Sequence, residues 1–392
     1  FLVDFFLEDG QLSVYQSKPD QQWDEFEADK TYYMDVVLRD EVEMNKFVEY
    51  SGSTLETLIS KFGAEDGQKW DFFGNSVSIT VPSHDGLYAL VGAFGTDVSG
   101  NLSDTTGSAY LFQNKLAGQG WKITASDGPL PEDPSYGKKV AITSGSDGLY
   151  MIMGAREEDS VGADAGAAYL YYSNSAGVLT EHKLTASTNA AGDGYGASVD
   201  IVSGSTGIYV LVTAPGDDDV ASAAGAGYVY HSTSAGILSE QKLVASDGGA
   251  NQLLGDRAAI TTGSDGIYVV LATTERDTFR GALYTYKITD MLSPGTTVEN
   301  ILTGTLVGGG GQFGVATDIV SGSDGVYVMG GQLGTAGAPD NGSGSATVFR
   351  ITDFTDLTTT ISQKLTSSDA IATMFLNTMK DYFPDHRLRH DN

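Results

Sequence analysis

The sequence contains no cysteine among its 392 residues. A disulfide, a thiolate nucleophile and a Cys-ligated metal are therefore excluded. Basic residues are also scarce, with 22 Lys and Arg against 51 Asp and Glu, and the formal net charge is −29. Phosphate backbones and anionic membrane surfaces repel such a chain, so we expect no nucleic-acid partner and no direct membrane insertion.

Recognisable catalytic motifs are missing as well. The chain has 5 histidines, and none lies in a nucleophile or metal-binding motif. The run "GGGG" at Gly308 to Gly311 is not followed by the Gly-Lys-Ser/Thr of a phosphate loop. We therefore expect no catalytic residue and no enzyme, and a propeller-based hydrolase or lyase is the least favoured function.

What the sequence does contain is an internal repeat. A glycine turn followed by tyrosine recurs five times, and the tyrosines are 62, 59, 59 and 59 residues apart. An aromatic or leucine residue followed by glycine precedes each turn at nearly the same spacing, so two independent markers give a period of about 59 residues. The turn tyrosines are Tyr88, Tyr150, Tyr209, Tyr268 and Tyr327.

Each repeat predicts four β-strands, for which Tyr195 to Asp247 serves as the example. "YGASVDIV" alternates like a strand, "GSTG" is a turn, and "IYVLVTAP" is apolar throughout, as in a strand covered on both faces. The unit is completed by an acidic loop, a third strand "AGYVYHS", the turn "TSAG" and a fourth strand "ILSEQKLVAS". Repeated four-stranded antiparallel units are typical of an all-β protein with the β-propeller fold.

These motifs resemble a known family. The first three repeats have Phe/Tyr-Gly, then an apolar strand ending in "VGA", "MGA" or "TAP", then a small-residue strand ending in aromatics. This order is similar to the FG-GAP repeat of integrin α-chain propellers. The resemblance covers Lys61 to Asp369. It implies a propeller, most often of seven blades, used for recognition or adhesion. We favour seven blades, with six as the alternative.

The resemblance implies a single propeller domain in three parts. Residues 1–60 are interpreted as closing strands and a degenerate blade, with "FLVDFFLEDGQLSVYQ" as a hairpin. Residues 61–363 are five FG-GAP-like blades, and residues 364–392 begin a further blade and continue as a C-terminal tail. Strands from both ends of the chain would then remove exposed sheet edges.

Binding is expected on the face formed by the long loops between second and third strands, because these loops differ in every repeat whereas the short turns do not. Family members carry a D-x-D-x-D-G-x-x-D calcium loop in the first turn, but here that turn holds at most one carboxylate, too few for calcium. No cofactor is therefore expected, and calcium is retained only as a weak candidate at the triplet Asp217 to Asp219. The candidate ligand-binding residues are Asp97, Asp104, Glu157, Glu158, Asp159, Asp217, Asp218, Asp219, Arg276, Asp277, Arg280 and Asp340.

The expected function is that of an extracellular or cell-surface adhesion or assembly module that binds a protein partner or neighbouring subunit through this face. Asn101 and Asn341 fit the N-glycosylation rule, which agrees with a secreted glycoprotein. A glycan-binding, lectin-like propeller is the alternative, although its pocket residues would be expected to recur with the repeat.

Overall fold

The computed structural model describes most of residues 63–365, together with the strand backbones at 3–8, 11–16, 47–51 and 54–59. Contacts divide the chain into two compact units, one of residues 1–63 and 114–119 and the other of residues 64–113 and 120–392. The positions within 63–365 that lie outside the described residues are 65, 83–85, 97–105, 114–119, 128–134, 175–177, 277–279, 294–295, 305–311, 334–343, 357 and 359.

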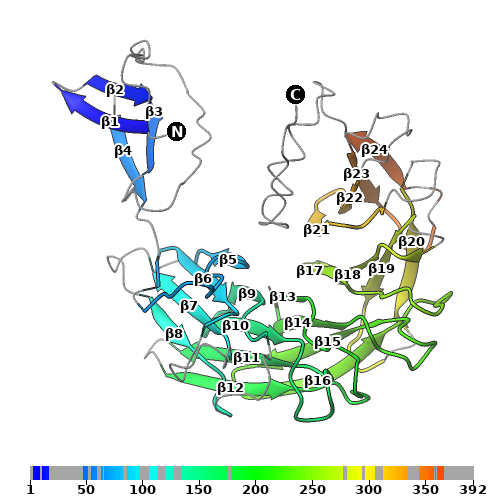
Figure 1. Cartoon of the computed structure of the whole chain (residues 1–392). Coiled ribbons are helices and arrows are strands. Elements are labelled where there is room, and N and C mark those ends of the chain that lie inside the picture. The colour runs from blue at the N-terminus through cyan, green and yellow to red at the C-terminus, as the bar shows by residue number, and fades with distance from the viewer. Residues whose placement is uncertain are drawn as a thin grey trace, which may run out of the picture. The chain divides into compact units, whose positions relative to one another are not determined.

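The larger unit confirms the all-β prediction. Its strands form five four-stranded antiparallel sheets, one for each repeat, in which strands that are consecutive in sequence are neighbours in the sheet. We name these sheets blades 1 to 5 in chain order, and Figure 1 shows them from cyan to orange. The strands of blades 1 and 2 are β5 Val77–Thr80, β6 Tyr88–Ala93, β7 Ser108–Gln113, β8 Trp121–Ile123, β9 Lys139–Ser144, β10 Gly148–Ala155, β11 Ala167–Asn174 and β12 Leu179–Leu184. Those of blades 3 to 5 are β13 Val199–Gly204, β14 Gly207–Ala214, β15 Ala226–Thr233, β16 Gly236–Leu243, β17 Arg257–Gly263, β18 Gly266–Thr273, β19 Ala282–Ile288, β20 Val298–Leu302, β21 Thr317–Gly322, β22 Gly325–Gln332, β23 Ser345–Ile351 and β24 Ile361–Leu365.

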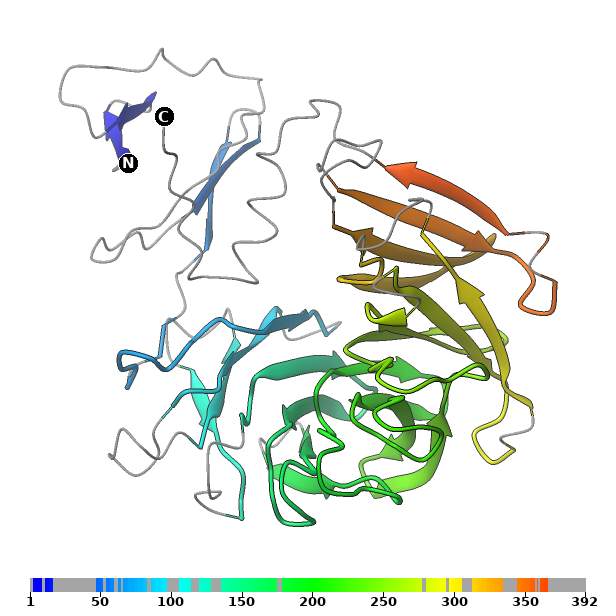
Figure 2. The same ribbon diagram turned by 45° about the vertical axis from the view of Figure 1, so that its right-hand side comes forward.

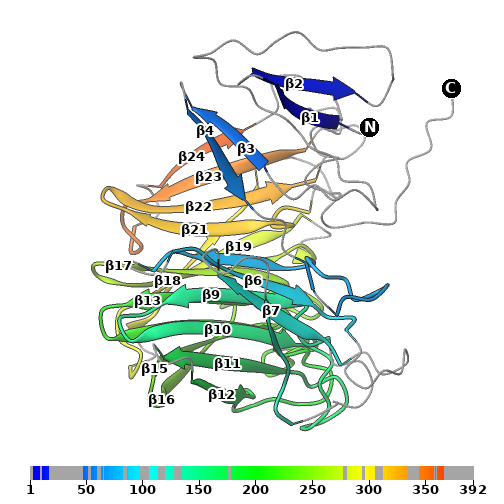
Figure 3. The same ribbon diagram turned by 90° about the vertical axis from the view of Figure 1, so that its left-hand side faces the viewer.

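The second strands of blades 2 to 4 are largely apolar because the blades on either side cover both of their faces. In β10, Met151 and Met153 pack into one hydrophobic cluster with residues of blade 1, and Ile152 between them packs into another with residues of blade 3. Successive side chains of a strand point to opposite faces, which accounts for this division. The prediction of a second strand covered on both faces is confirmed in β10, and Figure 3 shows β9 to β12 as neighbouring strands of blade 2.

Consecutive blades meet along their first strands. β5 contacts β9, β9 contacts β13, β13 contacts β17 and β17 contacts β21. A short parallel bridge adds a second link, since the glycine before the third strand of one blade pairs with the aromatic or leucine residue that opens the next repeat. These bridges are Gly107 with Tyr136, Gly166 with Tyr195, Gly225 with Leu254 and Gly281 with Phe313.

The N-terminal unit contains two hairpins. β1 Val3–Glu8 pairs with β2 Gln11–Gln16, so the predicted first hairpin is present, and β3 Phe47–Ser51 pairs with β4 Thr54–Ile59. The division of the chain at residues 60 and 363 and the number of blades both stay predictions, and residues 366–392 lie outside the described part. None of the described helical residues belongs to a segment with the length and hydropathy of a membrane span.

Candidate functional site

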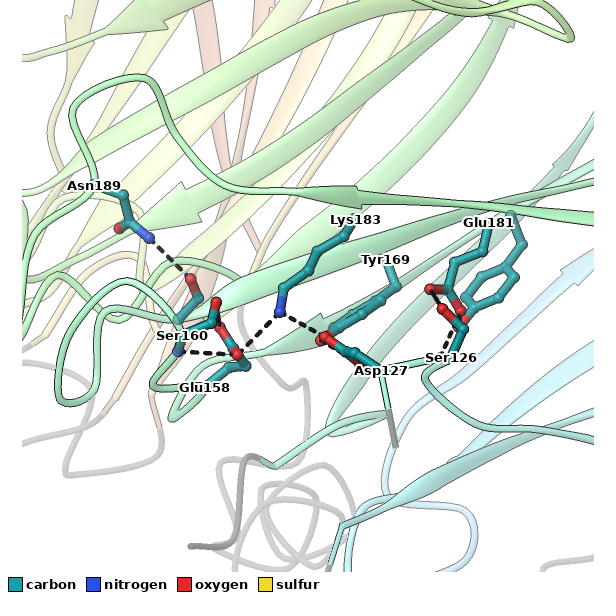
Figure 4. A network of polar contacts seen from close by, with 10 residues as sticks. Ser126, Asp127, Glu158, Ser160, Tyr169, Glu181, Lys183 and Asn189 are labelled. Carbon is teal, nitrogen blue, oxygen red and sulfur yellow. Dashed lines mark hydrogen bonds and ion pairs between the residues drawn. The ribbon is translucent and has the colours of Figure 1, made fainter. Parts of the chain in front are cut away.

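The loops between second and third strands carry a polar cluster that joins neighbouring blades. In blade 2, Lys183 Nζ on β12 lies 2.6 Å from Asp127 Oδ2 and 3.0 Å from Glu158 Oε1. Tyr169 OH on β11 donates to the same Asp127 carboxylate, and Lys183 Nζ lies 5.4 Å from the Tyr169 ring centroid. Asp127 follows the last strand of blade 1, so this blade-joining cluster, drawn in Figure 4, holds blade 2 to blade 1.

Related arrangements recur in blades 1, 3 and 4. In blade 3, Lys242 Nζ lies 2.6 Å from Asp217 Oδ2, and Tyr228 OH donates to Asp217. Thr188 of blade 2 occupies the position of Asp127 in blade 1 and Asp247 in blade 3, and its Oγ1 lies 3.0 Å from Tyr228 OH. Blade 1 uses Lys122 and Tyr110 on Asp66, and blade 4 uses Arg276 and Tyr284 on Asp247.

The lysines of these clusters stay charged. Burial would lower the pKa of Lys183, but hydrogen bonds to Asp127 and Glu158 outweigh it and raise that pKa. The pKa of Lys242 is raised for the same reason by Asp217 and Asp219. Burial and the neighbouring carboxylates raise the pKa of Tyr169, so it remains a neutral donor. The clusters are therefore ion pairs with a hydroxyl donor.

A second polar contact lies beside the blade-joining clusters of blades 2, 3 and 4. Glu181 on β12 accepts a hydrogen bond from the backbone N–H of Ser126 at 3.0 Å and another from Tyr171 OH at 2.7 Å. Figure 4 places Glu181 and Ser126 next to Asp127. Glu240 in blade 3 and Glu299 in blade 4 accept equivalent bonds from Ser187 and Ser246.

Several predicted binding residues are thus part of the contacts between blades. Glu158 and Asp217 are almost wholly buried against Lys183 and Lys242, and the side chain of Arg276 is paired with Asp247. Of the remainder, Glu157 lies 3.6 Å from Lys138 Nζ, Asp159 accepts from the Asp164 N–H, and Asp218 and Arg280 are exposed. The predicted residues that lie outside the described part are Asp97, Asn101, Asp104, Asp277, Asp340 and Asn341.

The aspartate triplet is largely occupied by the protein's own cation. Lys242 Nζ binds both Asp217 and Asp219, at 2.6 and 2.5 Å. Among the residues that the structure describes, no group of three or more His, Asp or Glu side chains is arranged to hold a metal ion. Calcium at this loop therefore stays a prediction.

A cavity of about 550 Å³ lies on the other side of the blades, between blades 4 and 5. The cavity is lined largely by the short turns, where the sequence analysis did not expect binding. Figure 2 shows the two sheets, from yellow-green to orange. Tyr268 of blade 4 and Phe354 of blade 5 meet there with ring centroids 5.0 Å apart. Its polar lining comes from Ser264, Asp265, Lys287, Ser321, Ser323, Asp324, Thr352 and Asp353.

The carboxylates of this cavity are ionised. Hydrogen bonds from Lys287 and Tyr268 lower the pKa of Asp265. The hydroxyl of Tyr327 and the guanidinium of Arg350 lower that of Asp324, and hydrogen bonds from Thr355 lower that of Asp353. The cavity therefore offers charged acceptors beside serine hydroxyls, which can donate or accept.

The signals for both features were present in the sequence. The tyrosine of each "SDG-x-Y" turn donates to the turn's own aspartate, as Tyr150 does to Asp147 at 2.9 Å. The Lys-Leu/Ile-x-Ala-Ser-Asp motif, which begins on the fourth strand and is complete in blades 1 and 3, contributes lysine and aspartate to the blade-joining clusters. Pairing between blades was missed because repeat alignment alone does not say which copies touch.

Comparison with known proteins confirms the family resemblance. Residues 57–112 and 179–230 match the FG-GAP repeat. The second match begins on β12, the fourth strand of blade 2, and ends on β15, the third strand of blade 3. Among curated proteins no match was found.

Two solved structures are similar in outline. One is a xylan β-1,4-xylosidase from Bacillus halodurans C-125, with 11% identity over 67% of this chain and 49% of that chain and a TM-score of 0.35. The other is a mutant of the GH43 protein BlXynB from Bacillus licheniformis, with 12% identity over 72% of this chain and 53% of that chain and a TM-score of 0.37. This chain thus spans about half the length of either protein.

These structures correct the predicted function. These structures contradict the expectation of an adhesion or assembly module that is not an enzyme, since a xylosidase is a hydrolase. Hydrolysis was among the least favoured functions in the sequence analysis. The expectation relied on the integrin resemblance and on loop carboxylates that the structure now places between blades. At this identity and TM-score the likeness carries nothing about substrate or mechanism.

Proposed function

With FG-GAP repeats as the premise, we propose that the protein is a carbohydrate-directed propeller that takes a short stretch of a neutral polysaccharide in the cavity between blades 4 and 5. The observation that carries this proposal is a cavity of about 550 Å³ that combines ionised carboxylates, hydroxyls and aromatic rings. This volume is within the usual range for small-molecule pockets, roughly 300 to 1,000 Å³.

The chemistry of the lining suits a sugar. Sugar hydroxyls are good donors to ionised carboxylates such as Asp324 and Asp353, and these charge-assisted bonds are stronger than neutral ones. Serine hydroxyls can accept from the sugar or donate to it. Three aspartates against one lysine repel uronic acids, which is why a neutral saccharide is proposed.

Hydrolysis is the second function under test, and it sets a clear requirement. Glycoside hydrolysis generally uses one ionised and one protonated carboxyl group. Asp265, Asp324 and Asp353 all have lowered pKa values, so they supply the ionised member only. A cleaving site here needs a proton donor in addition to these three.

The test is calorimetric titration with xylohexaose and cellohexaose, together with chromatography of the incubated sugars. In the double variant Ser264→Ala/Ser323→Ala we expect binding at least about tenfold weaker, since lost hydrogen bonds contribute roughly 0.5 to 1.5 kcal/mol each. Ser146→Ala is the matched control, because Ser146 has the same repeat position in blade 2 and lies outside the cavity lining.

Absence of saturable binding by both sugars, or an equal loss in the control variant, would overturn the proposal. Release of shorter sugars would assign hydrolysis. We also propose that this function operates outside the cell or at its surface, where polysaccharides are met. A protein partner, and glycans at Asn101 and Asn341, stay predictions.

A further inference from the structure

Blade 5 has a sheet face that the described residues leave uncovered. Leu211 and Leu243 of blade 3 face blade 4 and are 0% and 3% exposed. Met329 and Leu365, which have the same repeat positions in blade 5, are 42% and 43% exposed. Two repeat positions that are buried in blade 3 are thus exposed in blade 5, the last blade of the series.

Blade 1 has an uncovered face on its opposite side. Ile79 on β5 is 65% exposed, whereas Ile201, its equivalent on β13, is 6% exposed. Five blades therefore leave apolar repeat positions open at both ends of the run. In blades 2 to 4 the neighbouring blade buries these apolar positions. Another blade of the same repeat would bury them in the same way at either end of the series.

The second N-terminal hairpin aligns in sequence with the second half of a blade. Lys46 to Asp66 aligns without a gap on the 21 residues from Gly227 to Asp247. In this alignment β3 falls on the third strand β15, and β4 falls on the fourth strand β16. The FG-GAP match agrees, because it begins at residue 57 on β4 and at residue 179 on β12, also a fourth strand.

The first hairpin has the register of the other half. "VDFFLEDGQLSVYQ", from Val3, aligns without a gap on "VDIVSGSTGIYVLV", from Val199. β1 and β2 pair from Val3 with Gln16 to Glu8 with Gln11, and β13 and β14 pair over the equivalent positions. Both hairpins close with a two-residue turn.

Asp66 has the contacts of an aspartate that follows a fourth strand. Tyr110 OH donates to Asp66 Oδ1 at 2.7 Å, and Lys122 Nζ lies 2.5 Å from its Oδ2. In blades 2 and 4 this aspartate is supplied by the segment that follows the fourth strand of the preceding blade, as Asp127 and Asp247. Asp66 follows β4 in the same way.

We infer that residues 3–63 are a sixth blade of this repeat, with strand order β1-β2-β3-β4, in which β2 pairs with β3. The long segment between β2 and β3 then corresponds to the variable connection between second and third strands of the other blades. The domain boundary near residue 60 falls after the fourth strand of this blade.

Engineered disulfides test the pairing directly, because the chain contains no cysteine of its own. The alignments place Leu12 opposite Ser51, as Leu149 is opposite Ser173 in blade 2. Cross-strand partners have Cβ atoms about 4.5 to 5.5 Å apart, close enough for a strained or ordinary disulfide. The test variant is Leu12→Cys/Ser51→Cys, and the positive control is Leu149→Cys/Ser173→Cys.

We expect the test variant to form an intramolecular disulfide in most molecules, read by mass spectrometry and by gel mobility without reductant. Leu12→Cys/Thr57→Cys, which joins β2 to β4, is expected to form none. Gln16→Cys/Phe47→Cys probes the same strand pair if the first variant fails to fold. Free thiols in both β2–β3 variants while the positive control is oxidised, or disulfides formed only between two chains, would refute the sixth blade.

Discussion

Lys242 links the polar groups at the junction of blades 2 and 3. Its ammonium contacts the carboxylates of Asp217 and Asp219 and the hydroxyl of Thr188 in the preceding blade. Asp217 is almost completely buried, so it relies on this cation and on the Tyr228 hydroxyl. Removing one partner of a buried ion pair leaves an uncompensated charge, which costs more than the pair itself contributes.

Lys242→Met is therefore expected to lower the free energy of unfolding by about 2 to 3 kcal/mol. Lys287→Met is the matched control, because Lys287 also lies over a tyrosine ring, but its partner Asp265 is 60% exposed. An exposed pair contributes less than about 1 kcal/mol. Urea unfolding of the two variants measures the difference, and equal losses would show that burial of Asp217 is not what matters.

Asp200 makes the stability of the folded protein depend on pH. It lies on β13, where one carboxylate oxygen accepts the N–H of Ile260 in blade 4 and the other that of Ile201. Burial raises its pKa to about 6 against these hydrogen bonds, and Asp318 adds a repulsion. The folded state therefore binds a proton between the unfolded pKa near 3.8 and about 6, so this residue's contribution to stability falls as pH rises through that window.

We expect the stability of the wild type relative to Asp200→Asn to increase as the pH falls from 7.5 to 4.5, by about 1 to 3 kcal/mol. Asp318→Asn is the control, since Asp318 has the same repeat position on β21 and is exposed. Chemical unfolding at five pH values gives the comparison. A difference that stays constant with pH would place the Asp200 pKa at its ordinary value.

At the scale of the element, the glycine before each third strand fixes how closely two blades approach. Gly225 has φ +84°, and a Cβ at this position would lie 2.3 Å from the carbonyl oxygen of Leu254, its bridge partner in the next blade. No side chain fits this distance, so the bridge between blades requires glycine for space as well as for conformation.

Gly225→Ala is expected to destabilise the protein by about 3 kcal/mol or more, since backbone strain and a backbone clash combine. Gly192→Ala separates the two causes. Gly192 has φ +89°, but a Cβ there meets nothing within 4 Å. It should show the strain alone, about 1 to 2 kcal/mol. Thermal unfolding midpoints of similar size for both variants would contradict the steric explanation.

At the scale of the whole molecule, the net charge of −29 should make stability depend on salt. Repulsion among like charges disfavours the compact state, and salt screens it over about 10 Å at 0.1 M ionic strength. We expect the unfolding midpoint to rise by several degrees, about 3 to 8, between 20 and 300 mM NaCl. A fall would mean that the ion pairs between blades outweigh the overall repulsion.

The repeat made much of this architecture predictable. Strand order and turns of the five blades follow from alternation, apolar runs and glycine turns, as β13 to β16 illustrate. The site did not follow, because a loop carboxylate such as Asp217 is recognisable as polar but not as buried. Its burial depends on Thr188, Tyr228 and Lys242, which come from three other segments. The second hairpin was missed because its residues lack the glycine-tyrosine marker on which the repeats were aligned.

The family match from residue 179 to residue 230 begins on β12 of blade 2 and ends on β15 of blade 3. The unit that recurs in the sequence is therefore not the unit that folds as one sheet, and it contains the junction between two sheets within itself. A duplication of such a unit adds a blade together with the interface that packs it against its neighbour. Chains of this kind can lengthen by whole copies without having to evolve a new interface each time.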